Sequence, residues 1–309
     1  MRKGLVLEFW DRSEYLGINN KKYRDYVNKI LNEKLQEDAS YGDVTTNSLI
    51  NKNKNAKAVI IAKQDGVIAG IDEISSILKD KKIKINKNKK DGDKIKNNDI
   101  ILEIYWNARK ILSYERALLN MLQRMSGIAT LTNNTKKLTK NRCFIAGTRK
   151  TLFSFIDKKA ISAGGGLTHR LNLNDSILIK DNHLKLFNDN IGKALILAAK
   201  NKKAKYIEIE VKNEKEALEA AMAIKKIKSK KLFAIMFDNM EPIQIKNSIK
   251  KINSNYGKNV NKKIILFEAS GNINGKNISE YSKTGVDVIS SGSLTHSVKA
   301  FDLSLEIKK

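Results

Sequence analysis

Cationic side chains and histidines gather between residues 149 and 183 of the sequence. They fall in three motifs, AGTRKT (146–151), GGGLTHRLNLND (164–175) and IKDNH (179–183). The groups that matter are Arg149, Lys150, His169, Arg170 and Lys180. Positive charges held together in a weakly polar pocket repel one another unless an anion neutralises them. The pattern therefore predicts a pocket for small, multiply anionic substrates, and the alternative is a set of separate surface salt bridges.

Two carboxylates end apolar segments farther along the chain. Glu210 lies in YIEIEV (206–211), and Asp238 closes LFAIMFD (232–238). Glu208 has the same parity as Glu210, so both side chains are expected on one face of a strand. Carboxylates that face a cationic pocket can hold Mg²⁺, stabilise a developing sugar cation or orient lysines. A plain ion pair with lysines is the alternative for each.

Two Ser-Gly motifs follow the last apolar segments, EASGN (268–272) and SSGSLTH (290–296). Backbone N–H groups at such turns bind phosphate, and in α/β barrels the loops after the last strands are the usual place. Either motif alone could be an ordinary helix cap. As a pair they predict a substrate that carries phosphate.

A repeating order of strands and helices from residue 142 onward positions these motifs. The expected strands are 143–147, 176–180, 206–211, 232–238, 264–270 and 286–292. Strands that alternate with helices indicate parallel βα units. Six or seven such units predict a nearly closed α/β barrel, with the polar residues at the carboxyl ends of its strands, where barrel enzymes have their active sites.

The preceding residues have a different character. Residues 1–55 have helical spacing and turns, residues 57–105 contain short strands around one helix, and residues 109–140 form one long helical pattern. We therefore expect an α/β protein with an N-terminal α+β domain over 1–121, against which 298–309 pack, and a barrel domain over 122–297.

The composition of the chain limits which other classes of function are possible. The net charge is +26, but nine of the 59 basic residues are Arg, and the lysines are not interleaved with aromatic residues as a nucleic-acid stacking platform requires. We interpret them as solvated surface, with a polyanion-binding surface as the alternative. A single cysteine excludes a disulfide framework and a cysteine-based zinc site. No apolar run is long enough for a membrane span, and we predict a cytoplasmic protein without nucleic-acid or membrane partners.

Together these motifs resemble a known family. SYERALLNMLQRMSGIAT (113–130), GTRKT, AGGGLTHRLNLNDSILIKDNH (163–183), IEIEV, IMFDNM, EASGN and GVDVISSGSLTH are similar, in this order, to the signature of the quinolinate phosphoribosyltransferases. The resemblance extends from about Tyr23 to Leu305. It implies an N-terminal open sandwich and an incomplete, about seven-stranded barrel with TIM-like organisation.

The resemblance also implies an activity and a role for each motif. The reaction is phosphoribosyl transfer from phosphoribosyl pyrophosphate (PRPP) to quinolinate with decarboxylation, in NAD biosynthesis, and PRPP is bound with Mg²⁺. Lys150, Glu210 and Asp238 are the expected catalytic residues, the last two also facing Mg²⁺. Quinolinate is expected to bind Arg116, Arg149, His169, Arg170 and Lys180. The 5′-phosphate is expected to bind Ser270, Gly271, Asn272, Ser291, Gly292 and His296. Because the family position that matches Arg116 acts in the partner subunit's site, a homodimer is implied, and a higher oligomer is compatible with it.

Two alternatives stay open at this point. One is a relative of the same fold that acts on another pyridine or pyrimidine-like acceptor. The other is a basic nucleic-acid-binding protein, which gives no reason for Ser-Gly motifs at strand ends. One departure from the family pattern is the absence of a Pro-Gly turn in TRKTLFSFIDKKA, which could loosen the loop that carries Lys150.

Overall fold

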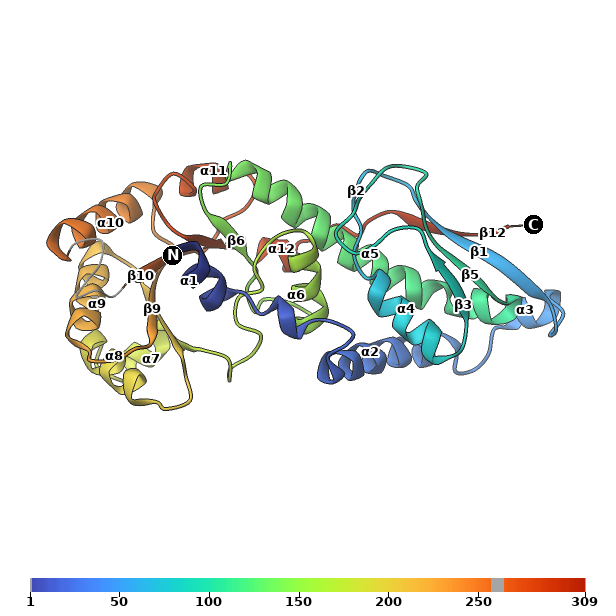
Figure 1. The fold of residues 1–309 in the computed structure, drawn as a ribbon, viewed down its shortest axis with the longest axis horizontal. Coiled ribbons are helices and arrows are strands. Elements are labelled where there is room, and N and C mark those ends of the chain that lie inside the picture. Colours follow the sequence, from blue (N-terminus) through green and yellow to red (C-terminus); the bar gives the residue numbers. More distant parts are fainter. Residues whose placement is uncertain (1, 257–263, 309) are drawn as a thin grey trace. The chain divides into compact units, whose positions relative to one another are not determined.

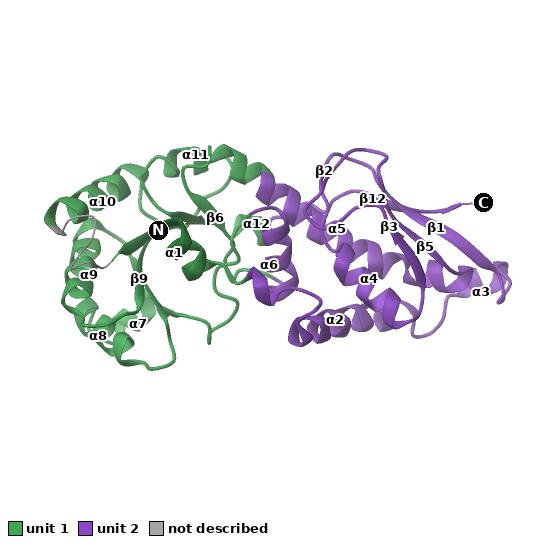
Figure 2. Cartoon of the chain, viewed as in Figure 1, with its two compact units in different colours: residues 1–12, 134–151, 166–296 green, residues 13–133, 152–165, 297–309 purple. Residues whose placement is uncertain are grey.

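The fold comes from a computed structural model that describes residues 2–256 and 264–308. The chain forms two compact units, shown in Figure 2. Unit 1 consists of residues 1–12, 134–151 and 166–296, and unit 2 of residues 13–133, 152–165 and 297–309. The boundary expected from the sequence, after residue 121, lies within helix α5 (Ala108–Leu138). The contacts instead assign residues 1–12 to unit 1 and residues 122–133 and 152–165 to unit 2.

Unit 1 is built on a parallel sheet of six strands. Its order is β6 (Phe144–Ala146), β11 (Val288–Ser290), β10 (Ile265–Ser270), β9 (Leu232–Asp238), β8 (Tyr206–Val211) and β7 (Ile177–Ile179). Each strand falls within a range expected from the sequence. Leu167 adds one parallel bridge to Ala146 beside β6, in the place where a further strand would stand. The α/β class and the incomplete barrel are confirmed, with six strands rather than seven in the part of the chain described.

Helices cover the outer face of this sheet (Figure 1). They are α7 (Asp181–Lys185), α8 (Ile191–Lys200), α9 (Glu214–Lys226), α10 (Pro242–Tyr256) and α11 (Ile278–Tyr281), whereas the short helix α12 (Ser293–His296) follows the carboxyl end of β11. Helix α9 shows why they pack there, because Ala217, Ala220, Ala221 and Ile224 recur at helical spacing and are all buried in the main hydrophobic core. Asn213 begins this helix by accepting a hydrogen bond from the Glu216 N–H at 2.9 Å.

Helix α1 (Arg2–Trp10) packs against the inner face of the same sheet. Val6, Phe9 and Trp10 form a second core with inward residues of the strands. These strand residues are Ala146, Ala234, Leu266 and Val288, together with Leu167. Arg2 pairs with Asp287 at 2.6 Å. Apolar side chains thus fill the barrel interior at the end where the strands begin.

Unit 2 contains a four-stranded antiparallel sheet in the order β12 (Leu303–Lys308), β1 (Asn55–Ala62), β5 (Ile100–Asn107) and β3 (Lys84–Lys87). A small antiparallel ribbon pairs β2 (Gly66–Val67) with β4 (Lys94–Ile95). The remaining elements are η1 (Ser13–Tyr15), α2 (Lys21–Ala39), α3 (Val44–Leu49), α4 (Ile71–Asp80), α5 and α6 (Ser154–Ala163). The α+β character expected for this part of the chain is confirmed.

Two carboxyl groups lie close together in the interior of unit 2. Glu73 is fully buried and accepts a hydrogen bond from the Tyr23 hydroxyl at 2.7 Å. Asp91 accepts one from the Ile71 N–H at 2.8 Å. Burial, and then the charge of Asp91, raises the pKa of Glu73 from its ordinary value of 4.5 to about 8. Glu73 is therefore neutral in the folded state at pH 7 and ionised in the unfolded chain.

This difference makes the stability of unit 2 depend on pH. Because the folded-state pKa of Glu73 is the higher one, stability is full below about pH 4.5 and falls as pH rises to about 8. Glu73→Gln keeps an oxygen for the Tyr23 hydroxyl and cannot ionise. We expect the free energy of unfolding of Glu73→Gln to rise relative to wild type between these two pH values, by at most about 1.4 kcal/mol per pH unit. Urea unfolding at several pH values measures this difference, and Glu37→Gln, a change at an exposed carboxyl, is the matched control. Parallel curves for Glu73→Gln and wild type would contradict the expectation.

Candidate active site

A cavity of about 840 Å³ opens at the carboxyl ends of the strands of unit 1. Every strand of the sheet contributes to its lining, either by its last residues or by the loop that follows. Of the predicted site residues, those that line it are Arg149, Lys150, His169, Arg170, Lys180, Glu210, Asp238, Ser270, Gly271, Asn272, Ser291, Gly292 and His296. Motifs more than 140 residues apart in sequence therefore meet in one cavity, as the parallel topology requires.

The cationic side chains differ in how the protein holds them. Arg170 is buried, and burial followed by the charge of Arg149 lowers its pKa. An arginine side chain nevertheless stays charged in proteins. The Lys180 Nζ donates to Glu210 Oε1 at 2.6 Å. Arg149 and Lys150 are exposed residues of the loop after β6. The repulsion between Arg149 and Arg170 is the situation that an anionic ligand relieves.

Glu210 and Asp238 present oxygen atoms to the same cavity. Glu210 is partly buried and shares its Oε1 with Lys180, and Asp238 Oδ2 accepts from the Asn239 side chain at 3.1 Å. Carboxylate and amide oxygens beside an open cavity are the donor set that Mg²⁺ prefers when it keeps several waters and binds substrate phosphates. These residues therefore fit the ion expected from the sequence.

The loops after β9 and β10 are tied to each other. Asn239 and Asn272 both have positive φ, and the Asn272 Nδ2 donates to Asn239 Oδ1 at 3.0 Å. Gly271 lies between β10 and Asn272 with φ of +94°, and a Cβ there would lie 2.4 Å from Asn239 Oδ1. A side chain at this position would push the two loops apart.

The loops after β6 and β11 are also joined. The Thr295 hydroxyl donates to the Lys150 carbonyl at 2.7 Å. A Cβ on Gly292 would lie 2.9 Å from the His296 ring and 3.3 Å from the Lys150 side chain. Gly292 thus allows Lys150 and His296 to approach the same turn.

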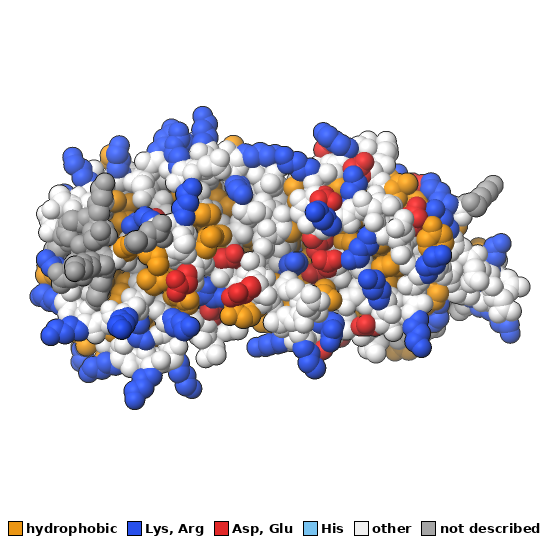
Figure 3. All heavy atoms as spheres, in the orientation of Figure 1, with side chains coloured by type: hydrophobic (Ala, Val, Ile, Leu, Met, Phe, Trp, Pro, Cys, Tyr) orange, Lys and Arg blue, Asp and Glu red, His pale blue; other side chains and the backbone are white. Residues whose placement is uncertain are grey.

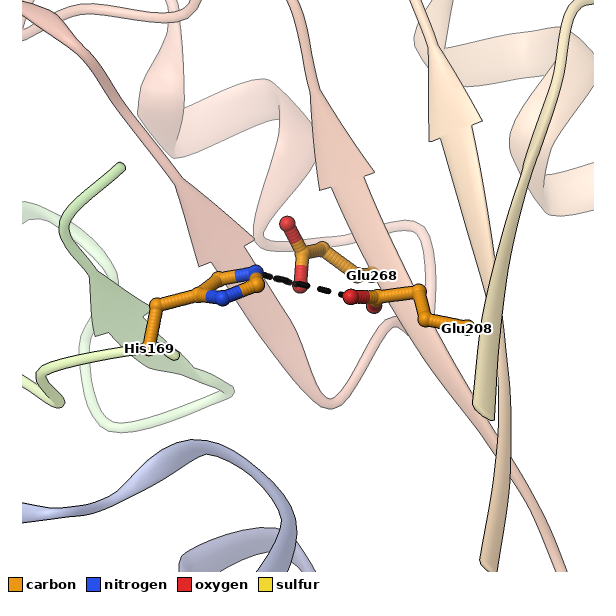
Figure 4. Close-up of side chains that lie close together, drawn as sticks. All are labelled: His169, Glu208 and Glu268. Carbon is orange, nitrogen blue, oxygen red and sulfur yellow. Dashed lines mark hydrogen bonds and ion pairs between the residues drawn. The ribbon is translucent and has the colours of Figure 1, made fainter. Parts of the chain in front are cut away.

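Below the cavity lies a buried cluster of His169, Glu208 and Glu268, shown in Figure 4. The His169 Nε2 is 3.1 Å from Glu268 Oε2 and 3.6 Å from Glu208 Oε2. Both glutamates are fully buried, and neither is among the cavity-lining residues. Burial raises the pKa of Glu208 well above its usual range, and burial opposed by the Ser290 hydroxyl raises that of Glu268 to about 7.

Sequence reasoning placed Glu208 on the inner face, noted Ser290 only as part of the SSGSLTH motif, and gave no role to Glu268. The available signal was an ionisable residue in the otherwise apolar run IILFEAS (264–270). His183, also in the predicted cationic region, does not line this cavity. It lines a neighbouring cavity, and its Nδ1 accepts from the Lys180 N–H at 2.9 Å.

Arg116 lies on α5 in unit 2, and 65% of its side chain is exposed. Its guanidinium is 3.3 Å from Glu115 Oε1. A role in a partner subunit's site therefore stays a prediction. The remaining positive charge is dispersed, because Figure 3 shows Lys and Arg side chains scattered over both units on the face drawn, without one continuous patch.

A barrel whose strand ends bring together cations, carboxylates and Ser-Gly loops has the architecture of an enzyme for phosphorylated, anionic substrates. Residues 43–126 match the family described as "Quinolinate phosphoribosyl transferase, N-terminal domain", and residues 128–306 match the corresponding C-terminal domain. The chain belongs to the quinolinate phosphoribosyltransferase family.

Individual relatives agree over almost the full chain. It is 43% identical to the probable nicotinate-nucleotide pyrophosphorylase [carboxylating] of Methanocaldococcus jannaschii, covering 92% of this chain and 98% of the relative. Identity to the Bacillus subtilis protein of the same name is 36%, covering 91% and 93%. The solved nicotinate-nucleotide pyrophosphorylase of Francisella tularensis has a TM-score of 0.80 and 33% identity, covering 92% and 97%. Within the described residues, no helix has the length and apolar character that crossing a membrane requires.

The Gly271 geometry gives a prediction with an internal control. Gly271 and Gly285 have nearly equal positive φ, but a Cβ on Gly285 would meet nothing within 4 Å. Gly285→Ala should lose only the backbone preference, about 1–2 kcal/mol. Gly271→Ala should lose more, because the Asn239 side chain must also move. Urea unfolding of both variants measures the difference, and equal losses would contradict the close approach.

Proposed function

We propose that this chain transfers the phosphoribosyl group of PRPP to the ring nitrogen of quinolinate and removes one carboxylate as CO₂, giving nicotinate mononucleotide and pyrophosphate. The reaction belongs to de novo NAD biosynthesis. The observation that supports it most is the meeting of arginines, carboxylates and two Ser-Gly loops in one cavity of a family member. The cytoplasmic location stays a prediction, since an Arabidopsis thaliana relative is named chloroplastic.

Each half of the cavity suits one substrate. Quinolinate carries two adjacent carboxylates on a flat ring, and Arg149, Arg170 and Lys180 offer cations for them. Arginine can bind a carboxylate through two parallel hydrogen bonds, which lysine cannot reproduce. PRPP carries a 5′-phosphate, for which the loops at Ser270–Asn272 and Ser291–Gly292 offer N–H and hydroxyl donors. Lys150 lies beside the second of these loops, where its carbonyl accepts from the Thr295 hydroxyl, and we expect its amine to interact with the pyrophosphate.

The chemistry requires positioning and charge stabilisation rather than a nucleophilic side chain. The ring nitrogen attacks C1 of the ribose while the C1–O bond breaks and its electron pair leaves with pyrophosphate. Glu210 and Asp238 stabilise the positive charge that develops on the ribose. The ring nitrogen, now cationic, accepts the electron pair that remains when the C2–carboxylate bond breaks, and solvent supplies the proton that replaces CO₂ at C2.

Mg²⁺ supplies Lewis-acid neutralisation of the phosphate oxygens of PRPP when it is bound. Glu210 and Asp238 are the residues of this cavity that would hold it, directly or through water. Lys180 binds only one oxygen of Glu210, and Glu210 as a residue lines the cavity.

Purified protein incubated with quinolinate, PRPP and Mg²⁺ tests the proposal directly. We expect nicotinate mononucleotide and CO₂ in equal amounts. Quinolinate that yields no product, while another pyridine or pyrimidine acid reacts with PRPP, would assign the chain to a different acceptor. Polynucleotide added in place of substrates tests the remaining basic-protein alternative through salt-dependent binding.

Arg149→Lys tests the quinolinate subsite. It keeps the charge and removes the paired hydrogen bonds, so we expect the KM for quinolinate to rise by about tenfold to a hundredfold with little change in the KM for PRPP. Steady-state kinetics measure both constants. Arg142→Lys, an exposed arginine outside the cavity lining, is the matched control. An unchanged quinolinate KM would remove Arg149 from the subsite.

We also propose a homodimer in which Arg116 acts in the partner's cavity. The proposal can be tested with two inactive proteins, Arg116→Ala and Lys150→Ala. A mixed dimer has one cavity with both residues intact, so re-association of an equal mixture should restore roughly a quarter of the wild-type sites. Activity that stays at the level of the separate variants would place Arg116 in its own subunit's site or outside any site.

A further inference from the structure

The cluster beneath the cavity has hydrogen bonds in an order that defines the role of each member. His169 is buried and has a positive φ of 55°. Its Nδ1 accepts the N–H of Arg170 at 2.8 Å. An imidazole nitrogen that accepts a hydrogen bond carries no proton, so the ring proton is on Nε2. This Nε2–H points to Glu268 at 3.1 Å (Figure 4).

The other oxygen of Glu268 has a partner on the opposite side. The Ser290 hydroxyl donates to Glu268 Oε1. The Ser290 and Ser270 hydroxyl oxygens are 2.9 Å apart. Ser290 is the donor toward Ser270 as well, so its single proton is shared between the Glu268 carboxylate and the Ser270 hydroxyl oxygen, and the Ser270 proton stays available to the cavity. Ser270 in turn begins the SGN loop of the cavity.

The bonds therefore form one continuous chain from Ser270 through Ser290, Glu268 and His169 to the backbone of Arg170. Its two ends are cavity residues from different loops, one in the proposed phosphate loop and one in the proposed quinolinate subsite. Its centre, Glu268, is fully buried and outside the cavity lining. A carboxylate is suited to this centre because it accepts at both oxygens and donates at neither.

We propose that Glu268 is a positioning residue for both substrate subsites, holding Arg170 through His169 and Ser270 through Ser290. This inference rests on the proposed function for the identity of the two substrates. It changes the role expected of His169. With both ring nitrogens engaged by the protein, His169 orients Arg170 rather than binding a quinolinate carboxylate itself.

The same three side chains, His169, Glu208 and Glu268, could also be considered as metal ligands, since their donor atoms lie within 4.8 Å of one another. The nitrogen that faces both carboxylates is Nε2, and it carries the ring proton. A histidine bound to a metal has the opposite arrangement, with the remote nitrogen protonated and donating. The hydrogen bond from the Arg170 N–H to Nδ1 therefore favours the hydrogen-bonded chain over a metal site.

Glu208 provides a matched control for Glu268. It has the same side chain, is also fully buried and lies beside the same histidine. However, in the described part of the chain no serine or backbone donor reaches its carboxylate oxygens. Glu268→Gln replaces one acceptor by an NH₂ group that opposes either the His169 Nε2–H or the Ser290 hydroxyl. Glu208→Gln creates no such conflict.

Steady-state kinetics distinguish the two ends of the chain. We expect Glu268→Gln to raise the KM for quinolinate, the KM for PRPP or both by about fivefold or more, and Glu208→Gln to leave both within about twofold. Ser290→Ala should raise only the KM for PRPP. His169→Asn, which tolerates the positive φ, should raise only the KM for quinolinate. The two single-end variants keep the test decisive if Glu268→Gln does not fold. Equal effects of Glu268→Gln and Glu208→Gln, or equal shifts of both constants in Ser290→Ala, would overturn the proposal.

A second measurement does not depend on activity. The chain has three histidines, so ¹⁵N NMR of labelled protein, with His169→Asn to identify the signals, reports the tautomer of His169. We expect a neutral Nε2–H ring that does not change when quinolinate is added. A doubly protonated ring, or a divalent metal that co-purifies with wild type and is lost in Glu208→Gln, would refute the hydrogen-bonded chain. Absence of turnover by wild type would refute only the proposed function, because the tautomer can still be read.

Discussion

The alternation of side chains along parallel strands determines how unit 1 is organised. Successive residues of a strand point to opposite faces, so each strand gives one set of residues to the outer helices and the other to the interior. In β10, Ile265 and Phe267 pack in the outer core, whereas Leu266, Glu268 and Ser270 lie on the inner face. Along the strand, the inner residues are first the apolar Leu266, then the buried, ionisable Glu268, and finally the polar Ser270 at the open cavity.

This order divides the barrel interior into three levels. The lowest is filled by α1 and the apolar residues around Trp10. The middle level contains Glu208, Glu268 and His169, and the highest is the cavity with Glu210, Asp238 and the Ser-Gly loops. The buried hydrogen bonds of the middle level are strong because little water reaches them, and they limit the movement of the residues above. A rigid floor suits a reaction in which the protein mainly positions and neutralises its substrates.

Local patterns in the sequence predicted the strands of unit 1 and many of the polar residues that line the cavity. Strand ends were recognisable from apolar runs that stop at polar residues, and parallel topology then brings those ends together. Glu268 was missed because its importance depends on which side chains lie opposite it, and strand register between distant segments is not encoded in either segment alone. The pairing of β2 with β4 and the addition of residues 1–12 to unit 1 also depend on contacts between segments that are far apart in the sequence. Arg116 stays a prediction because its proposed partner belongs to another copy of the chain.

The pairing of β1 with β12 has a consequence for biosynthesis. Lys57 is aligned with Lys308 and Ala62 with Leu303, so a strand made early must wait for one that is made more than 240 residues later. Likewise, α1 is synthesised well before the strands that bury Phe9 and Trp10. Neither unit can therefore be completed on the ribosome in the usual order, from the amino terminus onward. Until residues 303–308 emerge, β1 has an open edge and α1 exposes aromatic side chains, which are the two features that chaperones and aggregation both recognise.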